Sequence, residues 1–247
     1  MKLRILTTGL LMLGLTAGLV MLGLPTLAIS GDADIRKALS AQYPGTEISS
    51  VSKTPYGGLY EVIVDGEVAY VTADGKYLIL GSVVDVSTKK NLTSARMEKL
   101  LEVKWSSLPF SQAIKVVKGD GSRKLAVFSD PDCPYCRRFE NELTKVNNVT
   151  IYTFLTPIES LHPAAVNIAK QIWCEKDRVG AWHDYMLKGV RPNGATTCNN
   201  PIDENMTLGN KLKVSGTPTL IFENGQRVPG MVPADKLDKM LTAAQGK

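Results

Sequence analysis

The sequence predicts a protein of two folded parts, a small α+β unit followed by a larger α/β unit. Asp-Gly pairs separate short apolar runs in the first part, a pattern typical of antiparallel hairpins because glycine accepts a positive φ. From Lys124 onward, the order strand–helix–strand, several helices, strand–strand–helix is typical of a compact α/β unit. The 247 residues are enough for two small domains, and 44% hydrophobic with 21% charged residues is ordinary for a globular protein.

The first thirty residues differ in composition from the rest of the chain. Lys2 and Arg4 precede a stretch without charge over residues 5–24, and small residues such as Ala28 follow it. This order predicts a secretory signal peptide over residues 1–30, cleaved near Ala28. A retained membrane anchor is the alternative, because about 20 apolar residues are long enough to span a bilayer. Export would place the four cysteines outside the cytosol, where disulfides persist.

Residues 31–91 are predicted to fold as one small unit. Asp32 or Asp34 is expected to cap a helix that ends near Gln42, before a Tyr-Pro-Gly turn. Apolar runs separated by turns then predict a meander of four strands, at residues 59–64, 68–72, 77–80 and 83–86. Because so few residues make a thin core, we expect a partner chain to cover part of its apolar face.

A second helix is predicted to link the two units. Thr93 or Ser94 is expected to cap it, and it runs to about Val103 within a linker over residues 92–110. The α/β unit follows over residues 111–247, and its first two strands are expected to be parallel because a helix connects them. Its strands are expected at residues 125–128, 149–154, 219–222 and 226–228, and its helices at 133–146, 163–174, 178–187, 203–213 and 234–244.

The motif Cys133-Pro134-Tyr135-Cys136 opens the first predicted helix of the α/β unit. The reactive form of cysteine is the thiolate, and the unpaired amides and dipole of a helix N-terminus lower the pKa of a thiol placed there. Pro134 suits the first turn, where no amide hydrogen is needed. Cys136 lies about one turn later on the same face, so it is expected to close a disulfide with Cys133. The motif therefore predicts thiol–disulfide exchange.

Charged residues flank this motif on both sides. Arg137 and Arg138 are expected to favour the Cys133 thiolate, whereas Asp130 and Asp132 are expected to oppose it. Since the two pairs act in opposite directions, local charge alone does not predict how far the pKa of Cys133 moves.

Two other roles compete with redox chemistry at this motif. A zinc site would need four ligands, but Cys174 and Cys198 are far apart in the sequence and the chain has only two histidines, His162 and His183. A purely structural disulfide is the second alternative. A strand directly before the motif and a helix directly after it favour redox use. We therefore predict no metal and no cofactor, and we expect both histidines at helix surfaces or in packing.

Cys174 and Cys198 lack such a motif, and we expect them to form a structural bridge. A second redox pair is the alternative, because an even number of cysteines does not fix their connectivity. A closed loop of about 25 residues would stabilise the fold by roughly 3.5 kcal/mol in the chain-entropy treatment.

Two motifs together resemble the thioredoxin superfamily, the CxxC that begins at Cys133 and Gly216-Thr217-Pro218-Thr219 before a late strand. The resemblance implies that the Thr217–Pro218 bond is cis and lies beside the active disulfide. It also implies that the Thr217 backbone pairs with an extended substrate chain. The site residues implied in this way are the catalytic Cys133 and Cys136 and the substrate-binding Pro134, Tyr135, Thr217 and Pro218.

The wider layout resembles the DsbC/DsbG family of bacterial periplasmic disulfide isomerases. This likeness covers nearly the whole chain. It rests on the leader, the small unit with Val-Thr-Ala-Asp-Gly-Lys-Tyr-Leu-Ile-Leu-Gly, the linker helix and the insertion with Ile-Trp-Cys. It implies a thioredoxin-like C-terminal domain with a helical insertion over residues 111–247. It also implies a small α+β, cystatin-like N-terminal dimerisation domain over residues 31–91 and a structural Cys174–Cys198 bridge.

By the same resemblance the protein is an enzyme, a periplasmic thiol:disulfide interchange protein. It would isomerise and reduce incorrect disulfides in misfolded exported proteins, and it would also act as a chaperone. The partners implied are a second copy of the chain, in a V-shaped homodimer, and a membrane thiol reductase of the DsbD type. Nucleic acid is not expected as a partner, because a formal net charge of +5 is too small to predict one.

Two features depart from the family pattern. Pro-Tyr stands between the cysteines where Gly-Tyr is common, so the resemblance does not set the redox poise. Val127 stands six residues before Cys133, where cytosolic thioredoxins usually have a buried Asp, so any proton acceptor is expected elsewhere. The competing hypotheses are a monomeric periplasmic thiol oxidase of the same superfamily, a redox-inactive periplasmic chaperone, and a glutaredoxin-like glutathione reductase, which export disfavours.

Overall fold

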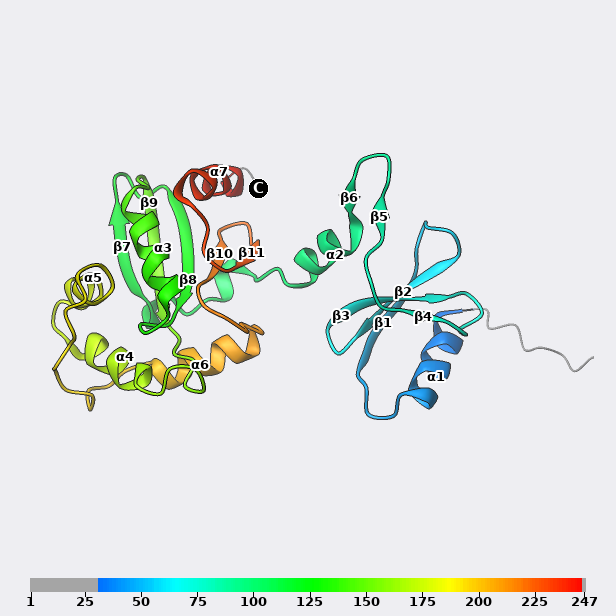
Figure 1. The fold of residues 1–247 in the computed structure, drawn as a ribbon, viewed down its shortest axis with the longest axis horizontal. Helices are drawn as coiled ribbons and strands as arrows, with labels where there is room; N and C mark the ends of the chain where they lie inside the picture. Colours follow the sequence, from blue (N-terminus) through cyan, green and yellow to red (C-terminus); the bar gives the residue numbers. More distant parts are fainter. Residues whose placement is uncertain (1–30, 246–247) are drawn as a thin grey trace, which may run out of the picture. The chain divides into compact units, whose positions relative to one another are not determined.

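The computed structural model describes residues 31–245, which form two compact units (Figure 1). The first unit ends at Leu80 and the second begins at Gly81. The signal peptide predicted over residues 1–30 lies outside the described residues. Among the helices that are described, none is both long enough and apolar enough to cross a membrane.

The first unit packs one helix against a four-stranded antiparallel sheet in the order β1-β2-β3-β4. Ile35 on the helix is buried against Val62 and Val71 of the sheet, so apolar burial holds the two layers together. The turn between β2 and β3 has positive φ at Asp65 and Gly66, as the Asp-Gly pair predicts. The elements are α1 (Asp32–Gln42), β1 (Ile48–Lys53), β2 (Leu59–Val64), β3 (Glu67–Thr72) and β4 (Leu78–Ile79).

The start of this unit differs from the prediction in two details. Gly31 is the N-cap residue of α1, so the prediction of a cap by Asp32 or Asp34 is wrong. Both carboxylates lie in the first turn, where negative charge favours the helix dipole. Strand β1 was not predicted, because Val51 is the only one of its six residues that is buried and serines make up half of the strand.

The predicted fourth strand of the meander belongs to a separate ribbon. β5 (Val84–Asp85) pairs with β6 (Lys90–Asn91) in a two-stranded sheet of their own. Asn91 then caps α2 (Leu92–Leu100), because its side chain accepts a hydrogen bond from Ser94 N at 2.8 Å. The prediction of a cap by Thr93 or Ser94 is therefore wrong.

The linker predicted over residues 92–110 is helical only in its first part. The hydroxyl of Thr93 accepts a hydrogen bond from Val83 N at 2.9 Å, which ties the helix start to the preceding ribbon. Helix α2 ends at Leu100, earlier than the predicted Val103. Two short 3₁₀ turns, η1 (Trp105–Ser107) and η2 (Phe110–Gln112), lead on to the second sheet.

The second unit is built on a five-stranded sheet in the order β11-β10-β8-β9-β7. β8 (Arg123–Ser129) and β9 (Val149–Leu155) are parallel, as predicted, and α3 (Pro134–Thr144) connects them. The edge strand β7 was not predicted, because lysines interrupt its short apolar run and adjacent valines break the alternation. The antiparallel strands are β7 (Ile114–Lys118), β10 (Thr219–Phe222) and β11 (Arg227–Pro229).

Three apolar clusters surround this sheet. One joins β8 to α3 and α7, and a second contains Phe128 and Phe154, whose rings stack at 5.0 Å. The third forms around Trp182 in the helical insertion and includes Cys133 and Cys136. Figure 1 shows α4 and α6 below the sheet and α7 above it. The helices are α4 (Ala165–Cys174), α5 (Arg178–Lys188), α6 (Ile202–Lys211) and α7 (Ala234–Ala244), close to the ranges predicted.

Candidate active site

Cys133 occupies the N-cap position of α3, in the turn that follows β8. The helix begins at Pro134, one residue later than predicted, because proline sets the φ of a first helical residue and needs no amide partner. Cys133 N donates to the Asp130 carbonyl at 3.2 Å, and Cys133 O accepts from Arg137 N at 3.1 Å. The sulfur is therefore held at the end of the helix where backbone amides lack intrahelical partners.

The two thiols of the motif differ in their access to solvent. Cys133 is 6% exposed and Cys136 is 0% exposed, and both are free thiols. Asp130 N donates to the Cys136 sulfur at 3.4 Å, which fixes this sulfur below the turn. A reactant that arrives from solvent therefore meets Cys133 and not Cys136.

Hydrogen bonds lower the pKa of the Cys133 thiol to about 5, well below its ordinary value. The largest cause is a hydrogen bond from the Cys136 thiol. The backbone amides of Cys136 and Tyr135 and the side chain of Thr217 act in the same direction, whereas burial opposes them. Amides at the helix N-terminus thus help to lower the Cys133 pKa, as the sequence predicts, and the Cys136 thiol makes the largest contribution to this shift.

The guanidinium groups that were expected to favour the thiolate lie on aromatic rings. Arg137 lies 5.3 Å from the ring centroid of Tyr185, and Arg138 lies 5.5 Å from that of Tyr135. Cations within about 6 Å of a ring centroid are attracted to its face. The low pKa of Cys133 therefore comes from hydrogen bonds rather than from these two charges.

The pKa of the Cys136 thiol is shifted in the opposite direction to that of Cys133. Burial raises the pKa of its thiol far above the ordinary value, and its hydrogen bond to Cys133 raises it further. A negative charge on Cys133 acts in the same direction. The pair therefore holds one ionised sulfur close to the surface and one protonated sulfur beneath it.

The loop before β10 brings a distant segment against Cys133. The Thr217–Pro218 bond is cis, as the resemblance implies. Thr217 O lies 3.3 Å from the Cys133 sulfur across 84 residues of sequence. Thr219 and Gly230 hold the loop, since Thr219 Oγ1 donates to Gly216 O at 2.7 Å and Gly230 N donates to Pro218 O at 2.8 Å.

Asp130 and His162 form a polar pair at this site. Asp130 is completely buried, and its carboxylate lies 2.9 Å from His162 Nδ1. His162, expected at a helix surface or in packing, lies in the segment before α4 and contacts the turn that carries Cys133 through Asp130. No sequence motif connects residues 32 positions apart, so only the fold reveals this pair. A second polar contact joins Tyr185 Oη to the carboxylate of Asp132.

A buried glutamic acid lies on the same helix, one turn beyond Cys136. Glu140 is 5% exposed, and its Oε1 accepts a hydrogen bond from Trp182 Nε1 at 2.9 Å. Burial raises its pKa to about 7, although the Trp182 hydrogen bond and the charge of Lys118 act in the opposite direction. A carboxyl group in this environment keeps its proton at pH values where an exposed glutamate has lost it.

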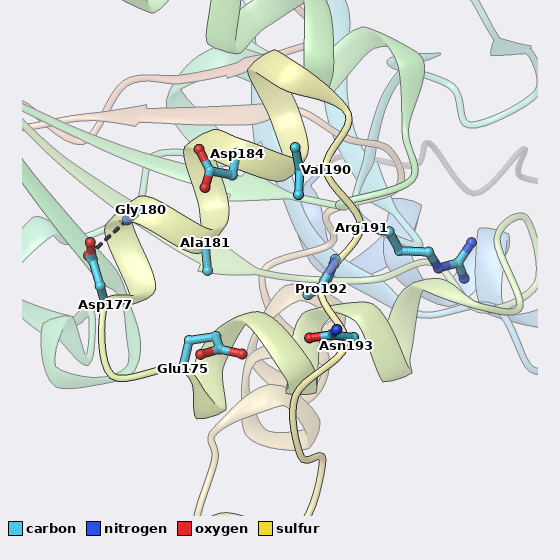
Figure 2. Close-up of a pocket in the computed structure, with 9 residues that line it drawn as sticks. All are labelled: Glu175, Asp177, Gly180, Ala181, Asp184, Val190, Arg191, Pro192 and Asn193. Carbon is cyan, nitrogen blue, oxygen red and sulfur yellow. Dashed lines mark hydrogen bonds between the residues drawn. The ribbon is translucent and has the colours of Figure 1, made fainter.

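A separate pocket lies between the end of α4 and helix α5 (Figure 2). Two of its carboxylates have structural partners: Asp177 accepts from Gly180 N at 2.9 Å as the N-cap of α5, and Asp184 pairs with Lys188 at 2.7 Å. Figure 2 shows Arg191 extending away from these carboxylates. Within residues 31–245, no group of three His, Cys, Asp or Glu residues is arranged to hold a metal ion.

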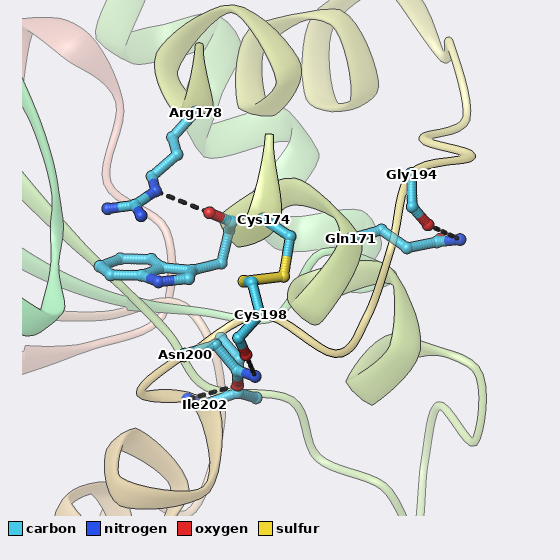
Figure 3. The surroundings of a disulfide bond; sticks show 8 residues. Gln171, Cys174, Arg178, Gly194, Cys198, Asn200 and Ile202 are labelled. Atoms are coloured by element: carbon cyan, nitrogen blue, oxygen red, sulfur yellow. Dashed lines mark hydrogen bonds between the residues drawn. A yellow bond between two sulfur atoms is a disulfide. The ribbon is translucent and has the colours of Figure 1, made fainter. Parts of the chain in front are cut away.

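Cys174 and Cys198 form a disulfide, so the predicted pairing is confirmed (Figure 3). Their Cα atoms are 5.7 Å apart, and Cys174 is the last residue of α4. Asn200 Nδ2 donates to Cys198 O at 2.9 Å, and Arg178 Nε donates to Trp173 O at 2.6 Å beside the bridge. The bridge ties the end of α4 to the loop that precedes α6.

Comparison with known families matches both parts of the chain. The family of thioredoxin-like domains matches residues 110–245, and the family of disulfide bond isomerase N-terminal domains matches residues 26–94. The crystal structure of a disulfide interchange protein from Neisseria gonorrhoeae has a TM-score of 0.55 and 44% sequence identity. That alignment covers 57% of this chain and 100% of the other.

Curated relatives extend the match over most of the chain. A probable thiol:disulfide interchange protein DsbC from Bordetella pertussis is 38% identical over 207 residues, 84% of this chain and 73% of the relative. The thiol:disulfide interchange protein DsbC from Escherichia coli K12 is 30% identical over 224 residues, 88% of this chain and 90% of the relative. With a thioredoxin-like domain, an isomerase N-terminal domain and these relatives, the chain belongs to the DsbC family of thiol:disulfide interchange proteins.

Proposed function

We propose that this chain isomerises and reduces incorrect disulfides in exported proteins, with Cys133 as the attacking sulfur and Cys136 as the resolving sulfur. The observation that carries the proposal is the difference between the two thiols. Cys133 has a pKa of about 5 and some exposure to solvent, whereas Cys136 is buried and its pKa is raised. Exchange needs one thiolate that attacks the substrate disulfide and a second thiol that stays protonated until the mixed disulfide has formed.

The first step is attack by the Cys133 thiolate on one sulfur of a substrate disulfide. The substrate S–S bond breaks, a mixed disulfide forms, and the second substrate sulfur leaves as a thiolate. If another substrate thiolate then attacks the sulfur bonded to Cys133, a new substrate disulfide forms and the Cys133 thiolate returns. This route is isomerisation, and it changes the oxidation state of neither protein.

The second route releases the substrate in reduced form. Cys136 loses its proton and attacks the Cys133 sulfur, so the enzyme holds the disulfide and the substrate holds two thiols. Formation of the mixed disulfide favours this step, because the Cys133 charge and hydrogen bond that raise the pKa of Cys136 are then gone. An external dithiol must restore the reduced pair, and a membrane thiol reductase of the DsbD type is the proposed donor.

We assign substrate binding to the residues around Cys133. Tyr135 is 57% exposed directly beside the reactive sulfur, where it offers an aromatic surface to an arriving chain. Thr217 and Pro218 lie against Cys133, so an extended substrate segment that pairs with this loop would bring its disulfide to the sulfur. Pro134 completes the proposed surface at the start of α3.

We also propose a homodimer formed through residues 31–91, with residues 92–110 as the linker and residues 111–247 as the catalytic domain. The support is the short edge strand β4, where Tyr77, Ile79 and Leu80 are exposed. An edge strand with exposed apolar side chains readily pairs with another chain. A monomeric mass in solution would contradict this proposal and favour a thiol oxidase.

Export to the periplasm is proposed from the composition of residues 1–30 and from the Cys174–Cys198 bridge, since disulfides persist outside the cytosol. Cell fractionation with mass spectrometry of the mature N-terminus tests both export and cleavage. Recovery of the unprocessed chain in the cytosol would contradict this proposal.

The test of function is refolding of a multi-disulfide protein that starts with scrambled bridges. The native protein should accelerate recovery of the correct bridges, and the double variant Cys133→Ser/Cys136→Ser should not. Equal recovery with the double variant and the native protein would reject the proposed chemistry. If both instead suppress aggregation equally and neither changes the bridges, the protein is a chaperone without redox turnover.

A further inference from the structure

A buried pair of polar side chains lies beneath the reactive sulfur and has no role in the exchange steps above. Asp130 is 0% exposed. Its Oδ1 accepts from Asp132 N at 2.8 Å, and its Oδ2 accepts from Ile158 N at 2.7 Å and lies 2.9 Å from His162 Nδ1. A carboxylate only accepts hydrogen bonds, so Nδ1 of His162 carries the proton in this contact.

The backbone of Asp130 contacts both cysteines of the motif. Its N–H donates to the Cys136 sulfur at 3.4 Å, and its carbonyl accepts from Cys133 N at 3.2 Å. Any shift of Asp130 would therefore move both sulfurs. The side chain of Asp130 holds His162, whose imidazole lies close enough to Cys133 for a negative charge on that sulfur to raise the pKa of His162.

We propose that His162 is a positioning residue for disulfide exchange, because its imidazolium is held by Asp130 and offsets the carboxylate beside the Cys133 thiolate. The inference rests on the proposed function, since it assumes that Cys133 is the attacking sulfur. The His162 side chain is 23% exposed, so its ring can exchange protons with solvent, whereas the Asp130 side chain is buried. It thereby supplies a positive charge to a site whose arginines lie on tyrosine rings.

Three acidic groups face His162 from the turn after β8 and the start of α3. They are Asp130, Asp132 and Cys133, and all three raise the pKa of His162, with the Asp130 hydrogen bond as the largest cause. Glu159, three residues earlier on the segment of His162, is exposed. Linkage is reciprocal, so if the Cys133 thiolate favours the imidazolium, the imidazolium favours the thiolate by the same free energy.

The chain offers an internal control, because its only histidines are His162 and His183. His183 lies on α5, and burial and the charge of Lys118 lower its pKa. In an NMR titration of the imidazole protons, we expect the His162 midpoint to fall by at least about half a pKa unit, roughly threefold in proton affinity, from the reduced native protein to Cys133→Ser. The His183 midpoint should not move. Equal His162 midpoints in the two proteins would overturn the inference.

A matched pair of variants tests the reverse direction. His162→Gln keeps a hydrogen-bond donor for Asp130 but removes the charge, and His183→Gln is its control. At pH 5, close to the Cys133 pKa of about 5, alkylation of Cys133 by iodoacetamide should slow by roughly twofold or more in His162→Gln, which corresponds to about half a pKa unit. Alkylation should not slow in His183→Gln. Unchanged alkylation in a folded His162→Gln would also overturn the inference.

These measurements separate the inference from the proposal on which it rests. If the native protein shows no alkylation of Cys133 at pH 5 to 6, the assignment of the attacking sulfur fails. If the native protein reacts there and both glutamine variants react equally fast, only the role of His162 fails. Should His162→Gln not fold, the titration of the native protein and Cys133→Ser still decides.

Discussion

Two pairs of cysteines lie in the same folded unit, but one pair is reduced and the other forms a disulfide. Cys133 and Cys136 are free thiols at the N-terminal end of α3. Cys174 is the last residue of α4, and it forms a disulfide with Cys198 in the following loop. Cys133 and Cys136 are buried members of the apolar cluster around Trp182, and the partly buried Cys198 packs against the same cluster.

The difference between the pairs is their place on a helix. A sulfur at a helix N-terminus faces unpaired amides and the positive end of the dipole, which favour a thiolate. A sulfur at a helix C-terminus faces the opposite end, where a negative charge is disfavoured. The place of Cys133 at a helix N-terminus therefore favours a reactive sulfur, and that of Cys174 at a helix C-terminus does not.

The largest effect should follow from removing one member of the reactive pair. Cys133→Ser should reduce exchange to the rate without enzyme, because no other sulfur near the surface is ionised at neutral pH. Cys136→Ser should still attack substrate but should accumulate mixed disulfides, since the resolving sulfur is missing. Trapping with scrambled protein, followed by non-reducing electrophoresis, measures both. Mixed disulfides on Cys133→Ser would contradict the assignment.

The next largest effect concerns the structural pair. The double variant Cys174→Ala/Cys198→Ala should lower the free energy of unfolding by roughly 3.5 kcal/mol, because the chain loses the loop constraint on its unfolded state. Chemical denaturation measures this loss. Exchange activity of the folded variant should persist. Loss of exchange in a variant that remains folded would make this bridge a second redox pair.

Glu140 should give the fold a pH dependence that differs from that of the reactive pair. Its folded pKa of about 7 lies above the ordinary 4.5, so the folded protein binds a proton that the unfolded chain releases between these values. Stability should therefore be greatest below pH 4.5 for this group and should fall as pH rises toward 7, by a total on the order of 3 kcal/mol.

Glu140→Gln should remove this slope and keep the acceptor for Trp182 Nε1. The exposed Glu159→Gln is the matched control, and it should leave the slope unchanged. Denaturation at a series of pH values measures the slope. An identical slope in Glu140→Gln would show that another group binds the proton. Alkylation of Cys133 should not differ between the two variants.

The smallest effect tests how the two thiols of the reactive pair act on each other. Cys136→Ala removes the hydrogen bond that is the largest cause of the low Cys133 pKa. We expect that pKa to rise by about one unit, which lowers the thiolate population at pH 5 by roughly fivefold. Thiolate absorbance against pH measures the shift. Cys174→Ala/Cys198→Ala should cause no shift, and an equal shift in it would break the distinction between the pairs.

Much of the second unit could be predicted from sequence because its central elements carry strong local signals. The apolar run of β8, the proline at the start of α3 and the Thr-Pro pair before β10 each mark a boundary. The strands β1 and β7 were missed because serine and lysine interrupt their apolar residues, so neither shows a continuous apolar run or a strict alternation. The cap of α2 was misassigned because Asn91, Thr93 and Ser94 are all good caps, and only the pairing of Thr93 with Val83 decides among them.

The candidate site likewise contains residues that the sequence predicts and residues that only the fold brings together. The spacing of Cys133 and Cys136 is local, so the sequence alone points to both. The contact of Asp130 with His162 crosses 32 residues, and that of Thr217 with Cys133 crosses 84. Thr217 came from the resemblance to a family, whereas His162 had no such guide. Long-range polar contacts without a motif are formed by the fold, and they have no signature in the local sequence.

The most direct test of the account is the pH dependence of alkylation, mapped to each of the four cysteines by peptide mass spectrometry. In the native protein with its reactive pair reduced, Cys133 alone should be labelled at pH 6, with a midpoint near pH 5. Cys136, Cys174 and Cys198 should remain unlabelled. A Cys133 midpoint near that of free cysteine, about 8.5, or preferential labelling of Cys136, would contradict the claim that the Cys136 thiol and the amides of the helix N-terminus make Cys133 the reactive sulfur.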